Sequence, residues 1–131
     1  MNKTNFNVIL IGIVFDPKSR MLLLGKNKGD KEFSFLEGEL SQNRELDIEL
    51  KKVAKEKTGY KIHNLGAIYA RNCLKDCKEK LELFFLCEAT EGKEKPGKNV
   101  DELIWIKPLD IKKYLKEKLP SRLKEYIASL A

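Results

Sequence analysis

The chain has 131 residues, of which 42% are hydrophobic and 35% charged, and its net charge is +6 at pH 7. Apolar runs at residues 8–15, 21–24 and 83–87 exclude intrinsic disorder, and each is far shorter than the ~18 residues that a membrane span requires. We therefore expect one soluble domain covering residues 1–131.

In the first half of the chain, apolar patterns predict strands at residues 8–15, 21–25 and 33–36, with a turn at 16–19. A helix follows, because its apolar residues recur at helical spacing in one stripe: Leu46, Leu50, Val53 and Ala54. Ser41 or Asn43 is expected to cap its start. Gly59 is expected to end it, because glycine readily adopts the left-handed conformation.

The second half predicts strands at residues 62–70, 81–89 and 103–106, separated by a charged loop at 75–80 and a longer loop at 90–99. A short helix is expected at 109–116. A last amphipathic helix opens at Pro120 and places Leu123, Ile127 and Leu130 on one side. One mixed sheet with helices on both faces accounts for this order of elements.

The positive charge comes mostly from lysine, since only four of the 26 basic residues are arginine. Base-specific readout depends on the forked guanidinium of arginine, and no aromatic residues are interleaved with these lysines to stack on bases. We therefore read the lysines as a solvated surface and expect neither a specific nucleic-acid partner nor a membrane.

Three cysteines and one histidine limit the redox and metal chemistry. The odd number of cysteines, without a secretory segment, predicts a reducing cytoplasm. Cys73 and Cys77 are four residues apart, which is not the spacing of a zinc-binding pair, so we expect no structural zinc. His63 lies in a polar stretch and is interpreted as a surface residue.

Several local patterns together resemble the Nudix superfamily. The Nudix box reads G-x5-E-x7-R-E-U-x-E-E-x-G-U, where U is a bulky aliphatic residue, and Gly38 and Gly59 have the separation of its two glycines. Residues 21–26 resemble the second strand of the family, and residues 102–110 resemble its acidic, Trp, Pro-Leu-Asp passage. The resemblance covers residues 6–127 and implies a Nudix-type α/β/α sandwich.

Only three of the nine fixed positions of the box are kept, namely Gly38, Glu56 and Gly59. Five of the other six carry different residues: Arg44, Val53 and Lys57 replace glutamates, Lys52 replaces arginine, and Tyr60 replaces the last aliphatic residue. The five titratable positions, which carry four Glu and one Arg in the family, therefore change in formal charge from −3 to +2. In the family the position of Val53 faces the metal cleft, so we expect this side chain to be half-exposed there.

The resemblance implies hydrolysis of a diphosphate linkage with Mg²⁺ or Mn²⁺ held largely by box glutamates. Such hard cations need oxygen ligands, and a positively charged box repels them and attracts phosphate. We therefore expect a homologue with a degenerate box, little or no pyrophosphohydrolase activity and no cofactor. Its partner would be a nucleotide or another phosphate-containing small molecule, and the candidate binding residues are Gly38, Arg44, Lys57 and Lys26.

Two alternatives stay open. The first is a Mg²⁺- or Mn²⁺-dependent hydrolase of nucleoside diphosphate derivatives, with Glu56 as catalytic residue and inherited metal ligand. Loop carboxylates would then complete the metal site, and the candidates are Glu37, Glu39, Glu94, Asp101 and Glu102. The second alternative is a scaffold for protein interaction. A polar stripe on the predicted helix is interpreted as a solvated face and consists of Glu45, Glu49, Lys52 and Glu56.

Overall fold

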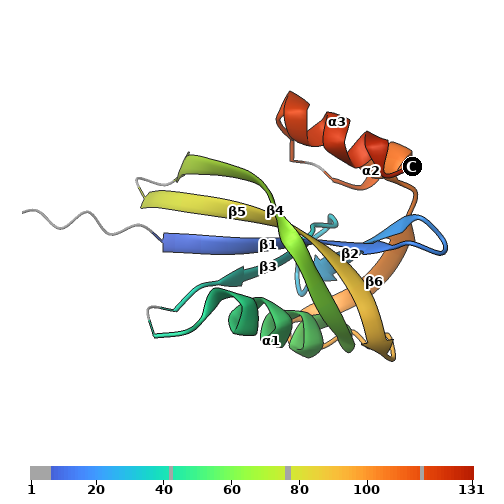
Figure 1. The fold of residues 1–131 in the computed structure, drawn as a ribbon, viewed down its shortest axis with the longest axis horizontal. Helices are drawn as coiled ribbons and strands as arrows, with labels where there is room; N and C mark the ends of the chain where they lie inside the picture. Colours follow the sequence, from blue (N-terminus) through green and yellow to red (C-terminus); the bar gives the residue numbers. More distant parts are fainter. Residues whose placement is uncertain (1–6, 42, 76–77, 116) are drawn as a thin grey trace, which may run out of the picture.

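The computed structural model describes residues 7–41, 43–75, 78–115 and 117–131, which form a mixed six-stranded sheet with helices on both faces (Figure 1). The elements, in chain order, are β1 (Asn7–Asp16), β2 (Met21–Asn27), β3 (Leu36–Glu39), α1 (Leu46–Thr58), β4 (Tyr60–Lys75), β5 (Lys78–Gly92), β6 (Val100–Ile106), a 3₁₀ turn η1 (Pro108–Asp110), α2 (Ile111–Tyr114) and α3 (Ser121–Ser129). The described ranges contain no helix long and apolar enough to cross a membrane.

Strand β1 organises the sheet. The strand order is β4-β5-β1-β2-β6, and β3 also pairs with β1. β5 runs parallel to β1 along one edge, whereas β3 and β2 pair antiparallel with the other edge. β3 takes the first part of this edge, from Ile9 to Gly12, and β2 takes its end, from Val14 to Asp16. β2 and β3 therefore diverge from a shared partner, and the space between them is the candidate site.

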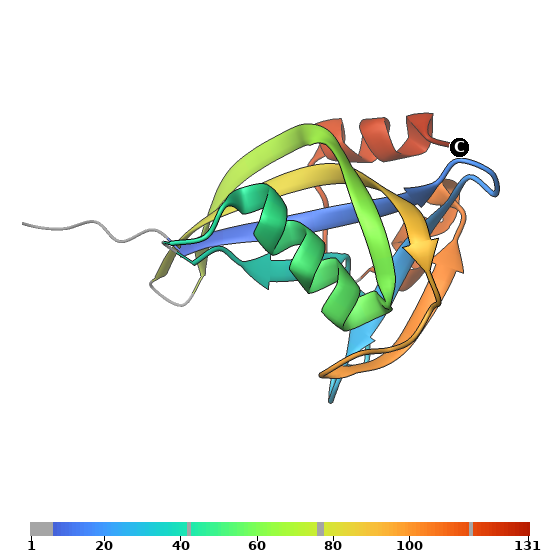
Figure 2. The ribbon, with the colours of Figure 1, turned by 60° about the horizontal axis from the view of Figure 1, so that its bottom comes forward.

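Apolar side chains pack on both faces of the sheet, because successive residues of a strand point to opposite sides. Leu10 and Val14 of β1 face α1, where they pack with Leu50. Ile11 and Ile13 face the other way, toward the C-terminal helices. Figure 2 shows α1 crossing one face and α3 covering part of the other. The predicted α/β/α sandwich with a mixed sheet is confirmed.

The apolar stripe of α1 is confirmed, but its predicted N-terminal caps are wrong. Leu50 and Ala54 are fully buried, and Leu46 and Val53 are partly buried against the same cluster. Gly59 ends the helix at φ 82°, as expected. The helix begins at Leu46, so the capping position is Glu45, which makes no side-chain capping bond. Ser41 and Asn43 lie too far upstream, since a cap must directly precede the first helical residue.

The strand boundaries also differ from the predictions. β3 starts at Leu36, and Phe33 and Ser34 form only isolated bridges. β4 and β5 extend through most of the predicted loop at 75–80, whose residues 76–77 lie outside the described residues. β5 also takes the first three residues of the predicted loop at 90–99. Backbone pairing across the hairpin continues through these polar residues, which hydrophobic alternation cannot reveal.

The cysteine and histidine predictions have different outcomes. Cys77 lies outside the described residues, so the predicted absence of a zinc pair stays a prediction. Within the described part of the chain, Cys87 is a buried free thiol, and burial raises its pKa to about 12. Such a thiol stays protonated and packs as a small apolar residue. His63 is exposed on β4, as expected.

Candidate functional site

A narrow hollow lies where β2 and β3 diverge. Its volume is only about 20 Å³, and its walls include Gly25 and Asn27 of β2, residues 34–37, and Lys57 and Thr58 of α1. A wider, open hollow of about 750 Å³ is lined by residues 29–34 with Glu117 and Lys118. Ser34 lines both hollows, but they lie on different faces of the sheet: Leu36 and Leu103 of the narrow one belong to the apolar cluster on the α1 face, whereas Phe33 of the wider one packs against the cluster on the other face.

Lys57 joins α1 to β3 at the narrow hollow. Its Nζ donates a hydrogen bond of 2.8 Å to the backbone carbonyl oxygen of Glu37. Lys57 stands in the last turn of α1, where its positive charge also interacts favourably with the negative end of the helix dipole. An ammonium group therefore occupies this side of the hollow and leaves two further N–H donors for a ligand.

Gly38 and Val53 bring β3 close to α1. A Cβ atom added at Gly38 would lie 2.6 Å from Cγ2 of Val53, so only glycine allows this approach. Val53 is partly buried and packs against the apolar cluster between α1 and the sheet. Gly38 follows Glu37, a residue of the hollow wall, but does not itself line the hollow, and its structural role is to let the strand and the helix pack.

The carboxylates of α1 do not form a cation site. Glu56 is 59% exposed and lies 4.0 Å from the ammonium of Lys52. Glu49 was expected on a solvated face, but its side chain is 11% exposed and lies 3.9 Å from the Arg44 guanidinium. No three His, Cys, Asp or Glu residues come together as a metal site in the described ranges. Within those ranges the carboxylates do not converge as a divalent cation would require.

The structure places two of the candidate ligand residues away from Lys57. Arg44 precedes α1, whose first residue, Leu46, is roughly 16 Å from Lys57 along the helix axis at 1.5 Å per residue, and the Arg44 side chain lies beside Glu49. Lys26 alternates in β2 with Gly25 and Asn27, which line the narrow hollow, and it therefore points to the opposite face. There its ammonium lies 4.9 Å from the centre of the Phe33 ring and 3.9 Å from Glu102.

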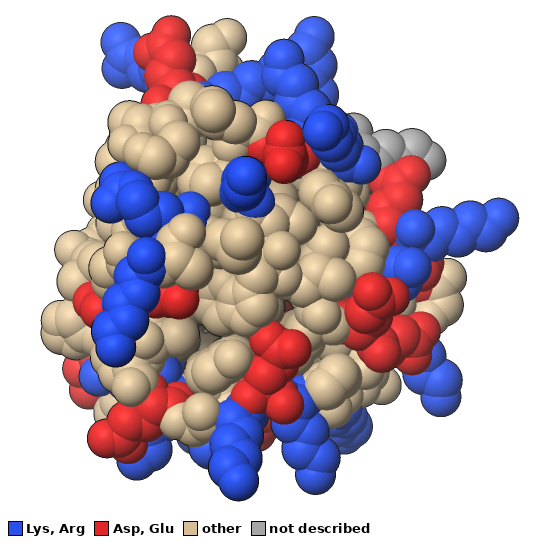
Figure 3. Space-filling view, turned by 90° about the vertical axis from the view of Figure 1, so that its right-hand side faces the viewer, with Lys and Arg blue, Asp and Glu red and all other residues tan. Residues whose placement is uncertain are grey.

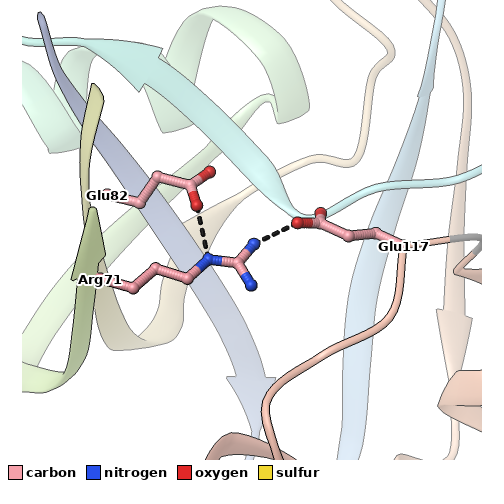
Figure 4. Close-up of polar contacts among 3 residues, drawn as sticks. All are labelled: Arg71, Glu82 and Glu117. Atoms are coloured by element: carbon pink, nitrogen blue, oxygen red, sulfur yellow. Dashed lines mark hydrogen bonds and ion pairs between the residues drawn. The ribbon is translucent and has the colours of Figure 1, made fainter. Parts of the chain in front are cut away.

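A charged cluster that the sequence analysis missed borders the wider hollow. Arg71 of β4 donates from Nε to Glu82 of β5 at 2.6 Å and also binds Glu117, which lies between α2 and α3 (Figure 4). These residues are 11 and 46 positions from Arg71, so no local motif could have linked them. Arg71 ties the chain before α3 to the sheet and thereby fixes one wall of the hollow.

The pKa of the Glu37 carboxyl group is raised above its ordinary value of 4.5, mainly because surrounding protein desolvates it and Glu82 repels its charge. Lys57 acts in the opposite direction. A raised pKa means that the folded state favours the protonated form, so ionisation of Glu37 lowers the stability of the fold as the pH rises. The candidate site thus combines a fixed ammonium with a carboxylate that is costly to ionise.

Glu37→Gln is expected to stabilise the protein at pH 7 by about 0.5 kcal/mol, a modest value because part of the residue's surface stays in contact with water, which screens its charge. The gain should appear as the pH rises above 4.5, where Glu37 ionises in the unfolded chain, and should vanish at lower pH. Urea unfolding from pH 3.5 to 8 measures this difference. Glu39→Gln, at an exposed position of the same strand, is the control; equal behaviour of the two variants would contradict the interpretation.

Solved structures share this architecture. A NUDIX hydrolase from Nitrosomonas europaea superposes with a TM-score of 0.80 at 14% sequence identity, over 96% of this chain and 72% of that one. The MutT protein from Methanosarcina mazei Go1 gives 0.75 at 13% identity, over 99% of this chain and 96% of that one. The chain has the Nudix fold. It is also similar to a UDP-X diphosphatase, with a TM-score of 0.76 and 14% identity over 99% of its own length, but it spans only 63% of that chain.

Comparison of the sequence with protein-family models and with curated proteins finds no match. The three residues that the sequence shares with the Nudix box lie in two neighbouring elements, β3 and α1, and at the end of α1. Gly38 lies in β3, Glu56 in α1 and Gly59 at the C-terminal cap of that helix. Lys57 directs its ammonium to β3.

Proposed function

We propose that this Nudix-fold protein binds a phosphate-containing small molecule, such as a nucleotide, and has little or no metal-dependent pyrophosphohydrolase activity. The observation that carries the proposal is the position of the Lys57 ammonium, 2.8 Å from the Glu37 carbonyl oxygen at the mouth between β2 and β3. The position corresponds to a box glutamate that would contribute negative charge toward a metal. In this chain it contributes a fixed positive charge instead.

An ammonium group can attract a phosphate, but it cannot replace the chemistry of a divalent cation. A bound Mg²⁺ or Mn²⁺ neutralises phosphoryl charge and lowers the pKa of an attacking water. Lys57 offers one charge and N–H donors, and it has no coordination site for water. This difference supports binding without hydrolysis.

The wider hollow of about 750 Å³ adds no net positive charge for a phosphate ligand, because its lining includes Asp30, Glu32 and Glu117 as well as Lys31 and Lys118. Because Arg44 and Lys26 lie away from Lys57, the proposed phosphate contact rests on Lys57 beside Gly38. We place the protein in the cytoplasm, which its buried free thiol at Cys87 supports.

The binding test uses calorimetry with pyrophosphate and with ADP, each in the presence of EDTA. We expect saturable binding to the wild-type protein and a loss of at least about tenfold in Lys57→Glu, because attraction becomes repulsion. Lys51→Glu makes the same charge change at an exposed position of α1 and should bind normally. Equal binding by wild type and Lys57→Glu would contradict the assigned contact, and an absence of binding would favour the scaffold alternative.

The activity test uses nucleoside triphosphates, ADP-ribose and dinucleoside polyphosphates with Mg²⁺ or Mn²⁺. We expect no hydrolysis above background. Turnover that Glu56→Gln abolishes would overturn the proposal and establish the metal-dependent hydrolase. Turnover that survives Glu56→Gln would place the chemistry outside the box.

A variant with restored glutamates tests whether the positive charge of these positions is what prevents metal binding. Replacing Arg44, Val53 and Lys57 together by glutamate should create Mn²⁺ binding that calorimetry detects in the absence of a phosphate ligand. Val53 and Lys57 are one turn apart and both contact β3, so their replacements would bring two carboxylates near the Glu37 carbonyl oxygen. A folded triple variant without Mn²⁺ affinity would show that charge at these positions does not decide metal binding.

A further inference from the structure

Beyond the C-terminal end of α1, the sheet face that this helix packs against bears a third hollow, of about 390 Å³. Its walls include Asp16 and Met21 at the β1–β2 turn, Tyr60 at the start of β4, Glu91 near the end of β5, and Trp105 of β6. Figure 3 views this end of the molecule and shows a broad uncharged surface with Lys, Arg, Asp and Glu side chains gathered mostly around its edge. The proposed phosphate site uses none of these five residues.

Two aromatic rings form an organised wall of this hollow. Tyr60 and Trp105 pack edge to face, with ring centroids 6.0 Å apart and an interplanar angle of 73°. Glu94 accepts hydrogen bonds from Trp105 Nε1 at 2.7 Å and from the Tyr60 hydroxyl at 3.5 Å, which fixes both rings from one carboxylate. A negative charge at the edge of both rings adds to the negative potential of their faces.

The charged residues that line the hollow all carry negative charge. The lining residues within the described chain include the carboxylates of Asp16 and Glu91 and contain neither lysine nor arginine, in a protein whose net charge is +6. Lys61 lies 3.5 Å from Glu91, but both side chains are at least two-thirds exposed, so this pair is weak and readily exchanged. Asp16 is held in place by hydrogen bonds from the Lys18 backbone N–H at 3.1 Å and the Ser19 hydroxyl at 2.8 Å.

We propose that this hollow binds a small organic cation of the alkylammonium class, against the Tyr60 and Trp105 rings and between the carboxylates of Asp16 and Glu91. Cations are attracted to the faces of electron-rich aromatic rings, and tryptophan is the most favourable of these. Surrounding carboxylates add Coulomb attraction, and the uncharged surface accommodates the alkyl groups. Tyr60 is central to this inference because an aliphatic residue at its position would provide no such ring.

The test titrates choline chloride into the full-length protein and follows the fluorescence of Trp105, the only tryptophan in the chain. We expect a saturable change with a dissociation constant in the millimolar range. The control ligand is 3,3-dimethyl-1-butanol, which has the shape of choline without its charge and should bind at least about tenfold more weakly. Sodium chloride at equal concentration controls for ionic strength. Equal affinity for the neutral analogue, or a change that does not saturate, would overturn the proposal.

Variants locate the site. Tyr60→Leu and Glu91→Gln should each weaken choline binding about threefold to tenfold, whereas Glu79→Gln, near the opposite end of β5, should leave it unchanged. Circular dichroism checks the folding of Tyr60→Leu, and Glu91→Gln tests the same site at an exposed residue that the core does not need. Unchanged affinity in Glu91→Gln and in folded Tyr60→Leu would place choline elsewhere and overturn the assignment. Lys57→Glu should bind choline normally, which separates this test from that of the phosphate site.

Discussion

Gly97→Ala is expected to lower the free energy of unfolding by about 3–5 kcal/mol, because the added methyl group has no room. A Cβ atom at this position would lie 1.5 Å from the carbonyl oxygen of Glu56 and 2.6 Å from its carbonyl carbon. Both are backbone atoms of α1 and cannot rotate away as a side chain could. The segment that contains Gly97 would therefore have to separate from the helix.

That separation would also break the contacts that complete the C-terminal end of α1. The N–H of Gly97 donates to the Lys57 carbonyl at 3.0 Å, and the N–H of Lys95 donates to the Thr58 carbonyl at 2.9 Å. The last carbonyl groups of a helix have no partner within it, so these bonds satisfy groups that otherwise need water. Since they also hold the backbone of Lys57, the variant should bind pyrophosphate more weakly even under conditions where it is folded.

Urea unfolding of Gly97→Ala beside Gly25→Ala measures the effect. Gly25 also lacks a positive φ, and the nearest atom to its added Cβ would be Cδ2 of Leu103, 3.3 Å away on a flexible side chain. We expect Gly25→Ala to change the stability much less. A Gly97→Ala protein as stable as the Gly25→Ala protein would show that the segment can shift at little cost.

Leu50→Ala is expected to cost about 2–5 kcal/mol of unfolding free energy, which is the range for truncating a buried leucine. Leu50 is 1% exposed and lies in the apolar cluster between α1 and the sheet. Alanine removes apolar contacts there and leaves a cavity, because the neighbouring strands cannot collapse into the space. The same helix holds Lys57 and Val53 against β3, so loosening it should affect the candidate site as well.

Ile48→Ala is the matched control for Leu50→Ala. Ile48 is also an aliphatic residue of α1, but it is 54% exposed. Its truncation should change stability by no more than about 0.5 kcal/mol, as for most surface substitutions. Thermal and urea unfolding of both variants measure the difference, and similar losses in the two would contradict the orientation of the helix.

Much of the secondary structure follows from local sequence. Residues 8–15 are a run of β-type apolar residues, and the stripe at 46–54 has helical spacing, because the period of an element decides which of its residues can share a buried face. Gly59 ended α1 as predicted, since left-handed backbone strongly favours glycine. The separation of Gly38 and Gly59 also supported the correct fold prediction, because these glycines lie in β3 and directly after α1, so their spacing reflects the length of the connection and the helix.

Only the tertiary structure decided which polar groups meet. Lys57 and Glu37 are 20 residues apart, and Arg71 and Glu117 are 46 apart, so their contacts exist only after the strands and helices have packed. Glu49 shows the same limit, because it occupies a polar position in the helical pattern but is buried beside Arg44. Hydrophobic periodicity reports which face of an element is covered. It does not report which charged side chain lies opposite, since that depends on the relative placement of elements distant in the chain.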